Sequence, residues 1–191
     1  MKKGFLNATK KIMLAGVLAA TPWLAQANST APIDPSRETV ELARKVRHEL
    51  VMLPFYGIFD NFSFRVDNGT VTLMGHVSRP VLKSDAANVI KRIEGVKGVI
   101  NEIEVLPLSN FDNRIRLSTA RAIYGSATLS RYGLGALPSI HIVVKNGEVT
   151  LEGVVATEMD RNVAFIRANG VFGVFKVNNH LLVEQASRKK A

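Results

Sequence analysis

The sequence contains few side chains that could carry out catalysis. Its histidines are His48, His76, His141 and His180, and no two of them stand at the spacing of a metal-binding motif such as HExxH. A serine-nucleophile elbow of the form G-x-S-x-G is also absent. The chain has no cysteine, which excludes disulfides, thiolate metal sites and lipid attachment to a cysteine. We therefore predict no catalytic residues, no metal site and no cofactor, and we interpret the protein as non-enzymatic.

Basic and tyrosine side chains offer a different chemistry, which is attraction to anionic headgroups. They gather on or just after a predicted helix at 113–124, and the candidate residues are Arg114, Arg121, Tyr124, Arg131 and Tyr132. Arg114 and Arg121 are seven residues apart and share one helix face. Each such charge contributes about 1 kcal/mol to membrane attraction at low salt. The alternative is an ordinary solvated helix face, whose charges contribute little.

An unusually apolar loop supplies a second group of candidates. Residues 53–59 read Leu-Pro-Phe-Tyr-Gly-Ile-Phe, although a surface loop should be polar, and the corresponding segment 132–137 is also apolar. The loop is either buried over a sheet or between domains, where aromatic side chains usually lie. Alternatively, Phe55, Tyr56 and Phe59 enter a membrane at the headgroup level.

An internal repeat organises the chain. Residues 62–105 align with 140–183 at an offset of 78 residues without gaps, and 14 of the 44 aligned pairs are identical. Typical residue frequencies would give roughly three identities. The identities include both Asn-Gly pairs, at 68–69 and 146–147. The chain therefore contains two copies of one module.

Each copy predicts the same order of elements from its hydrophobic periodicity. The first copy predicts a helix at 39–52, a strand at 62–66, a hairpin at Asn68-Gly69, a strand at 71–77, a helix opened by Ser78 and Pro80, and a strand at 99–105. The second copy predicts a helix at 113–124, a strand at 139–145, a hairpin at Asn146-Gly147, a strand at 148–155, a helix at 157–169 and a strand at 176–183. Asn-Gly is the signal for a two-residue type I′ turn, because both positions need positive φ.

This order predicts an α/β (α+β) fold made of two tandem αββαβ modules. We expect each module to be a three-stranded mixed sheet covered by two helices. A module of about 70 residues buries only a modest core, so we also expect the modules to pack on each other. The predicted boundaries are a first module at 36–106, a linker at 107–112 and a second module at 113–184.

The N-terminal residues predict export. Four lysines at 1–11 precede a short apolar run at 12–20, and Ala25-Gln26-Ala27 is a small-x-small cleavage signature. We therefore expect residues 1–27 to be a signal peptide that is cleaved near Ala27. The apolar run is shorter than the roughly 20 residues that a membrane-spanning helix needs, so no transmembrane helix is expected in the mature chain.

The excess positive charge lies mainly at the two ends. Loss of the four N-terminal lysines, from 25 basic residues set against 16 acidic ones, lowers the formal net charge from +9 to +5. The basic tail at 185–191 supplies three of the remaining five charges. The folded part is nearly balanced, which argues against a dedicated nucleic-acid-binding protein.

The repeated motifs resemble those of the BON domain family. They occur at 66–75 and 95–103 in the first copy and at 144–153 and 173–181 in the second. The residues that carry the resemblance, which we interpret as structural, are Asn68, Gly69, Gly75, Gly95, Asn101, Asn146, Gly147, Gly153, Gly173 and Asn179. The resemblance implies an αββαβ fold, a periplasmic or membrane-associated setting, a role in envelope integrity or osmotic stress, and attachment to phospholipid. It implies no reaction and no catalytic residues.

Together these observations predict a periplasmic protein with two BON domains that associates peripherally with anionic phospholipid surfaces. The alternative is a protein-binding adaptor in an envelope or secretion complex. In that case the apolar loops or an exposed sheet edge would recruit a polypeptide by strand addition. Neither hypothesis includes a nucleic-acid partner.

Overall fold

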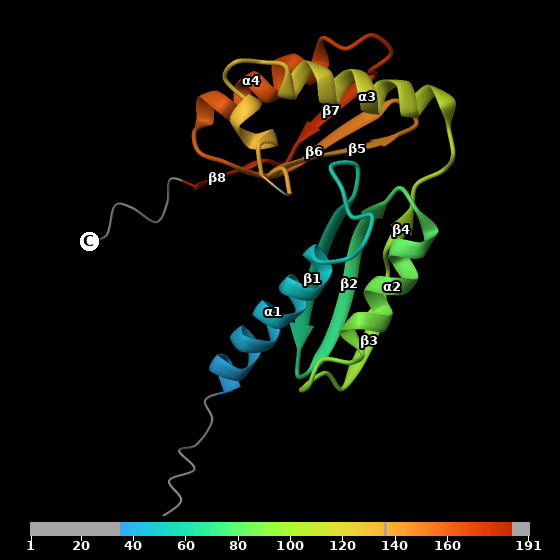
Figure 1. The fold of residues 1–191 in the computed structure, drawn as a ribbon, viewed down its shortest axis with the longest axis vertical. Coiled ribbons are helices and arrows are strands. Elements are labelled where there is room, and N and C mark those ends of the chain that lie inside the picture. Colours follow the sequence, from blue (N-terminus) through green and yellow to red (C-terminus); the bar gives the residue numbers. More distant parts are fainter. Residues whose placement is uncertain (1–34, 136, 185–191) are drawn as a thin grey trace, which may run out of the picture. The chain divides into compact units, whose positions relative to one another are not determined.

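The computed structural model describes residues 35–135 and 137–184 (Figure 1). The predicted signal peptide at 1–27 and the predicted basic tail at 185–191 lie outside the described residues. The described chain contains the two copies of the predicted module, and the α+β fold class is confirmed.

Both copies place a helix, a hairpin, a second helix and a final extended segment in the same order. The elements of the first copy are α1 (Pro35–Val51), β1 (Asn61–Asp67), β2 (Thr70–Val77), α2 (Pro80–Ile90), β3 (Gly98–Asn101) and β4 (Glu104–Val105). The elements of the second copy are α3 (Asn110–Tyr124), the 3₁₀-helix η1 (Ser130–Gly133), β5 (Ile140–Lys145), β6 (Glu148–Val155), α4 (Glu158–Asn169), β7 (Lys176–Asn179) and β8 (Leu182–Val183).

Each sheet is built around the second strand of its hairpin. In the first copy β2 pairs antiparallel with β1 and parallel with β3 and β4. In the second copy β6 pairs in the same way with β5, β7 and β8. Asn68 and Gly69 have φ values of 50° and 84°, and Asn146 and Gly147 have values of 52° and 78°. Both predicted Asn-Gly turns are therefore present, since a type I′ turn needs positive φ at both positions.

The predicted third strand is broken in both copies, so each sheet has four strands instead of the expected three. The side chain of Asn101 causes the break in the first copy. Its amide donates to the carbonyl oxygen of Lys83 in α2 at 2.7 Å, and its Oδ1 accepts from the N–H of Ile103 at 3.2 Å. Asn179 makes the equivalent bonds to Arg161 in α4 and to Leu181. These bonds hold the backbone in a bend that a continuous strand cannot adopt.

The helix α3 begins three residues before its predicted start, within the predicted linker. Ser109 caps it, because the Ser109 hydroxyl accepts from the N–H of Asp112 at 3.1 Å. The first turn of α3 thus occupies 110–112, which the sequence assigned to the connection. A serine followed three residues later by an acidic residue is a helix-start signal, and here it outweighs the apolar periodicity that set the prediction.

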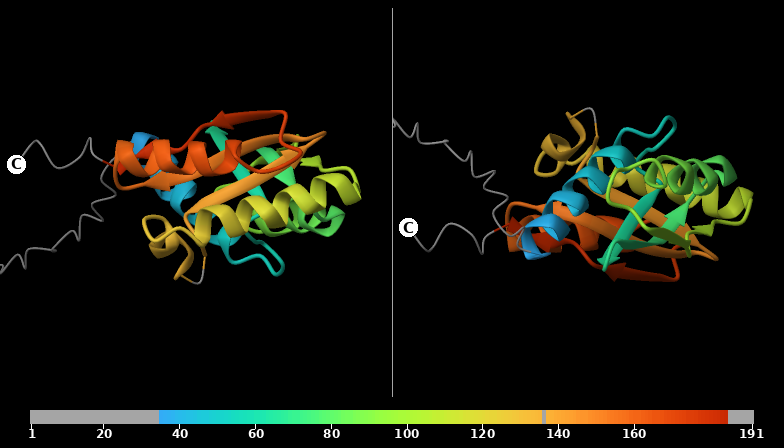
Figure 2. Two further views of the ribbon diagram at one scale, coloured as in Figure 1. Left: turned by 90° about the horizontal axis from the view of Figure 1, so that it is seen from above. Right: turned by 90° about the horizontal axis from the view of Figure 1, so that it is seen from below.

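Each copy has its own hydrophobic core between the helices and one face of the sheet. Figures 1 and 2 show α3 and α4 lying side by side over the second sheet. The fully buried side chains of the first core include Val46, Val71, Leu73, Leu82, Ile90 and Ile103. Those of the second core include Ile123, Leu129, Ile140, Ile142, Leu151 and Val149. The two equivalent cores account for the sequence repeat, because the identities fall at positions that pack or turn.

A glycine at the sixth position of β2 and of β6 allows the two strands of each hairpin to lie close together. Gly75 has φ of 111° and Gly153 has φ of 120°. A Cβ atom at Gly75 would overlap the carbonyl oxygen of Asn61, and one at Gly153 would overlap that of Ser139. Both glycines are therefore required by backbone geometry within the hairpin.

Candidate functional site

The apolar loop after α1 is divided between buried and exposed residues. Leu53 is buried in the first core. Tyr56 stacks on Phe62 with ring centroids 5.0 Å apart, and on His141 of the second copy with centroids 5.4 Å apart. Phe59 packs against the core of the second copy. Two of the three aromatic candidates thus lie in contacts within the protein.

The same loop is joined to the second copy by polar contacts. The N–H of Ile142 donates to the carbonyl oxygen of Ile58 at 2.7 Å. The Nδ1 of His141 lies 3.2 Å from the carbonyl oxygen of Gly57, and its Nε2 lies 3.5 Å from the hydroxyl of Tyr56. Burial lowers the pKa of His141 and raises the pKa of Tyr56 to about 12. Both side chains are therefore neutral at pH 7 and serve as uncharged contact groups.

Phe55 differs from its neighbours in the loop. Its side chain is 65% exposed, its φ is 68°, and the guanidinium of Arg79 lies 5.0 Å from the centre of its ring. A positive φ is uncommon for a bulky residue and fixes the direction of the exposed ring. Of the three aromatic candidates in this loop, Phe55 is exposed, whereas Tyr56 and Phe59 are half-buried.

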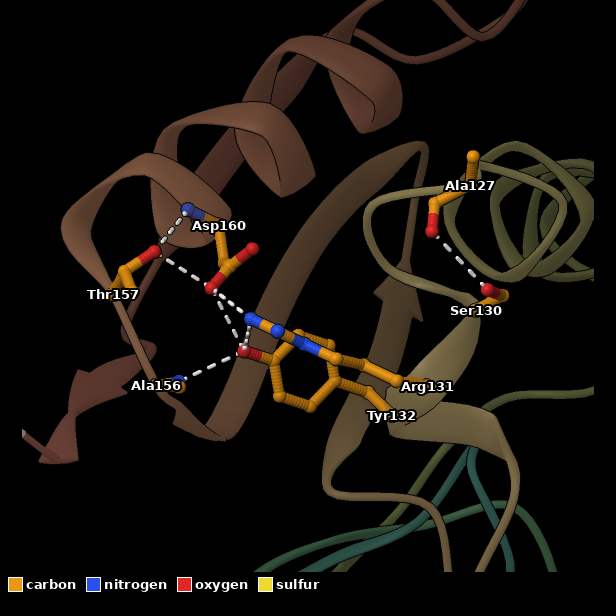
Figure 3. Close-up of polar contacts among 7 residues, drawn as sticks. All are labelled: Ala127, Ser130, Arg131, Tyr132, Ala156, Thr157 and Asp160. Atoms are coloured by element: carbon orange, nitrogen blue, oxygen red, sulfur yellow. Dashed lines mark hydrogen bonds and ion pairs between the residues drawn. The ribbon is translucent and has the colours of Figure 1, made fainter.

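Arg131 and Tyr132 surround a buried carboxylate in the second copy. Figure 3 shows Asp160, which is 2% exposed, at the centre of this cluster. Its Oδ2 accepts from Arg131 at 2.6 Å, from the Tyr132 hydroxyl at 2.9 Å and from the Thr157 hydroxyl at 2.6 Å. The cluster joins η1 to the first turn of α4, and Arg131 itself remains about half exposed.

The environment of Asp160 determines its charge. Burial would by itself raise the pKa of Asp160, but the hydrogen bonds from Thr157 and Tyr132 and the charge of Arg131 outweigh burial and lower it. The N–H of Asp160 also donates to the Thr157 hydroxyl at 3.1 Å, so Thr157 caps α4. A carboxylate that is ionised at neutral pH and accepts three side-chain hydrogen bonds through Oδ2 acts as a structural anchor.

Tyr124 is likewise engaged inside the second copy. Its hydroxyl donates to the carbonyl oxygen of Ile140, and its ring packs against the second core. Burial raises the pKa of Tyr124. Of the candidates on and after α3, Tyr124 and Tyr132 therefore contribute mainly to packing.

Arg114 and Arg121 remain exposed on one face of α3. Neither side chain has a hydrogen-bond or ion-pair partner among the residues that the structure describes. The only acidic residue of α3 is Asp112, which is buried and accepts from the N–H groups of Asn146 at 3.0 Å and Gly147 at 2.8 Å. The exposed face of α3 is therefore cationic, with no acidic side chain to offset its arginines.

Three phenylalanines are exposed near the start of α3, and none of them is among the candidates predicted from the sequence. Phe172 is 99% exposed, Phe175 is 75% exposed and Phe111 is 38% exposed. We refer to Phe111, Phe172 and Phe175 as the aromatic tip. The sequence repeat contains a signal for two of the three, because Phe172 and Phe175 align with the charged residues Glu94 and Lys97.

Comparison with known protein families explains the repeated architecture. The BON domain model matches residues 39–107 and 127–185, which together make up more than half of the chain. The chain belongs to the BON domain family. BON domains are non-catalytic binding domains that are associated with membranes, phospholipids or envelope proteins, and proteins that contain them are often periplasmic or membrane-associated.

Two solved structures resemble the two-domain chain at low identity. One is of CdsD, a structural protein of the Type III secretion system of Chlamydia trachomatis, with 14% identity, a TM-score of 0.30, and coverage of 76% of this chain and 94% of that chain. The other is the C-terminal domain of CdsD, with 15% identity, a TM-score of 0.27, and coverage of 75% and 98%. None of the curated protein sequences matches the chain.

The described part of the two BON domains contains neither a metal cluster nor a membrane span. Within residues 35–135 and 137–184, no three acidic or histidine side chains come together as a metal site requires. Among the same residues, no helix combines the length and apolar character needed to cross a bilayer. The exposed surfaces of the described chain include the cationic face of α3, Phe55 and the aromatic tip.

Proposed function

We propose that this protein is an exported, non-enzymatic periplasmic protein that associates with anionic phospholipid surfaces through its second BON domain and supports envelope integrity under osmotic stress. The observation that carries this proposal is the unbalanced positive charge on the exposed face of α3. Membership of the BON domain family supports the membrane-related role. The N-terminal sequence supports export, because it has the basic region, short apolar run and cleavage signature of a signal peptide.

The charge pattern of α3 differs from that of the equivalent helix in the first domain. The helix α1 carries Glu38, Glu41 and Glu49 among its basic residues, and Arg44 is paired with Glu41 at 3.0 Å. The helix α3 instead presents Arg114 and Arg121 without an exposed acid. Anionic lipid attracts such cations by about 1 kcal/mol each near the membrane surface, and salt weakens the attraction.

Apolar area beside the arginines adds a second attractive contribution. Leu117 lies between Arg114 and Arg121 along α3, and 42% of its surface is exposed. A helix face with basic residues and an exposed leucine is suited to the boundary between headgroups and acyl chains. The two kinds of contact together favour a phospholipid surface over a purely ionic partner.

Liposome flotation tests this proposal. We expect the full chain to float with vesicles containing phosphatidylglycerol more than with phosphatidylcholine vesicles, and to bind less at high salt. The double variant Arg114→Gln/Arg121→Gln should bind anionic vesicles roughly thirtyfold more weakly, because it removes two charges worth about 2 kcal/mol together. The matched control is Arg44→Gln/Arg47→Gln on α1, which changes the net charge equally and should bind like the wild type.

Binding that depends on neither salt nor anionic lipid would contradict this proposal. An equal loss of binding in the α1 control variant would also contradict it, because binding would then depend on the net charge of the protein and not on the position of the arginines. In cells, a strain lacking the protein should be rescued from osmotic or detergent sensitivity by the wild type and by the α1 control, but not by the α3 variant.

A further inference from the structure

The aromatic tip is a cluster of exposed rings at one end of the second BON domain. The rings of Phe111, at the start of α3, and Phe175, just before β7, lie with their centroids 6.0 Å apart. Phe172 belongs to the same connection between α4 and β7 and is almost completely exposed. Soluble proteins seldom leave neighbouring aromatic rings exposed unless the surface has a partner.

The backbone around the aromatic tip is shaped to hold the rings. The carboxylate of Asp112 accepts from the N–H groups of Asn146 and Gly147 and so fastens the β5–β6 hairpin to the first turn of α3. A Cβ atom at Gly147 would overlap the ring of Phe175, and one at Gly173 would approach the ring of Phe111 to 3.3 Å. Both glycines have positive φ. The two rings therefore pack directly on glycine backbone, which holds them in place on the surface.

The first BON domain shows that the fold does not need these rings. Glu94 and Lys97 occupy the positions that align with Phe172 and Phe175. The side chain of Lys97 lies over Gly69 as Phe175 lies over Gly147, because a Cβ atom at Gly69 would approach Lys97 Cγ to 3.1 Å. The same backbone thus carries charged side chains in one domain and exposed phenyl rings in the other. A requirement of the fold cannot explain this difference, but a binding role can.

The charges beside the rings identify the class of partner. Arg114 lies one helical turn from Phe111, and Lys176 directly follows Phe175. The Nζ of Lys176 forms a long, exposed ion pair with the carboxylate of Glu148 at 4.0 Å, so Arg114 is the cation beside the rings that has no ion-pair partner among the described residues. The carboxylate of Asp112 is buried. Exposed phenyl rings flanked by cations match the layered chemistry of an anionic bilayer, in which phosphates lie outside the acyl region.

We infer that the aromatic tip inserts Phe172 and Phe175 into the headgroup–acyl boundary of an anionic phospholipid bilayer, while Arg114 and Lys176 lie at the level of the phosphates. This inference rests on the proposed function and adds the site and depth of contact. The arginines of α3 supply the salt-sensitive part of binding, and the rings supply a part that salt does not weaken.

Flotation of the full chain with phosphatidylglycerol–phosphatidylcholine vesicles at low and high salt separates the salt-sensitive contribution of the arginines from the salt-insensitive contribution of the rings. The variant Phe172→Ser/Phe175→Ser should bind roughly a hundredfold more weakly at both salt concentrations, because burial of each phenylalanine contributes about tenfold in affinity. The matched control is Glu94→Ser/Lys97→Ser, at the equivalent positions of the first domain, and it should bind like the wild type. Circular dichroism should show that both variants are folded, since the substituted phenylalanines are exposed.

The fluorescence of a single tryptophan measures how deeply the aromatic tip inserts into the bilayer. The sequence has one tryptophan, Trp23, which lies in the predicted signal peptide, so Phe172→Trp carries the only indole of the mature protein. On addition of anionic vesicles we expect its fluorescence to shift to the blue and to be quenched by lipids brominated near the headgroup end of the acyl chain. Unshifted, unquenched fluorescence under conditions where the protein floats would overturn the inference.

The flotation results also distinguish failure of this inference from failure of the proposed function. If the wild type floats and Phe172→Ser/Phe175→Ser floats equally well, the aromatic tip is not the contact, although the proposed function stands. If the wild type floats with no vesicle, the proposed function and the inference both fail. Sedimentation would show whether the serine variant also dissociates a dimer, and dissociation with unchanged flotation would assign the rings to self-association and overturn the inference.

Discussion

At the scale of single residues, buried polar groups account for several features that the sequence pattern left open. Asp160 is the clearest case, because it accepts from three side chains while almost wholly removed from solvent. A carboxylate in such a position is stable only when its hydrogen bonds are satisfied. Their residue types indicate Arg131 and Tyr132 as binding candidates, and their contacts with Asp160 give them a structural role as well.

Substitution of Asp160 should destabilise the second domain. Asp160→Ala leaves the Tyr132 and Thr157 hydroxyls without their buried acceptor, and we expect the free energy of unfolding to fall by about 2–3 kcal/mol. Urea denaturation measures the loss. The control is Glu158→Ala in the same turn of α4, which removes only an exposed pair with Arg161 and should change stability by less than about 0.5 kcal/mol. Equal losses would show that the cluster contributes nothing specific.

The same carboxylate makes stability depend on pH. Because the pKa of Asp160 is lowered on folding, its ionised form stabilises the folded state fully above the unfolded pKa of about 3.9. This contribution is lost as the pH falls through the lower pKa of the folded state. The difference in stability between the wild type and Asp160→Asn should therefore be largest near neutral pH and should shrink below about pH 4. A constant difference would contradict this assignment.

At the scale of the elements, one asparagine in each domain sets how the final strand meets the sheet. Asn101 and Asn179 each bond to a carbonyl oxygen of the preceding helix and to an N–H two residues further on. The helix and the last strand are thereby fixed to each other, and the strand is divided. The repeat preserves this residue because it forms a specific junction between elements.

Removal of this junction should be costly compared with a change at its neighbour. Asn179→Ala breaks the bonds to Arg161 and Leu181, and we expect a loss of about 1–3 kcal/mol in the free energy of unfolding. Asn178→Ala, on the same strand β7, is the control, because no side-chain hydrogen bond of Asn178 is present among the described residues. Denaturant midpoints compare the two variants, and similar midpoints would contradict a role of Asn179 as a junction.

At the scale of the whole molecule, the apolar loop of the first domain supports the second domain. Phe59 packs against the second core, and the carbonyl oxygen of Ile58 accepts from the N–H of Ile142. A domain of this size has a small core of its own, so an added aromatic side chain is a substantial contribution. The prediction that the loop is buried at a contact between the modules thus describes Tyr56 and Phe59, but not Phe55.

Phe59 and Phe55 offer a matched pair of variants in one loop. Phe59→Ser should destabilise the second domain by about 1–3 kcal/mol, because it removes apolar surface from contact with that core. Phe55→Ser should have little effect, since the Phe55 ring is mostly exposed. Hydrogen exchange of amides in β5 and β6 reports the stability of the second domain. Unchanged exchange in Phe59→Ser would show that the domains do not support each other.

Most of the fold could be predicted from the sequence. The elements follow from period-2 and period-3.6 hydrophobic patterns and from Asn-Gly turns, all of which act over short distances along the chain. The repeat added an independent check, because two segments predicted the same order of elements. The family could be identified for the same reason, since its motifs are the turn and strand residues that local geometry demands.

Local sequence patterns could not predict which candidate side chains are exposed to solvent or which residues they contact. Sequence shows that a residue is aromatic or charged, but only tertiary contacts decide whether Phe59 is covered while Phe55 is not. In the same way, Phe111 and Phe175 lie 64 positions apart along the chain and share a surface only after the hairpin, α3 and the α4–β7 connection pack together. The sequence alone determined the two repeated modules, because local backbone preferences suffice for them. Only the tertiary structure decided which side chains face solvent, because burial depends on contacts between residues far apart in the chain.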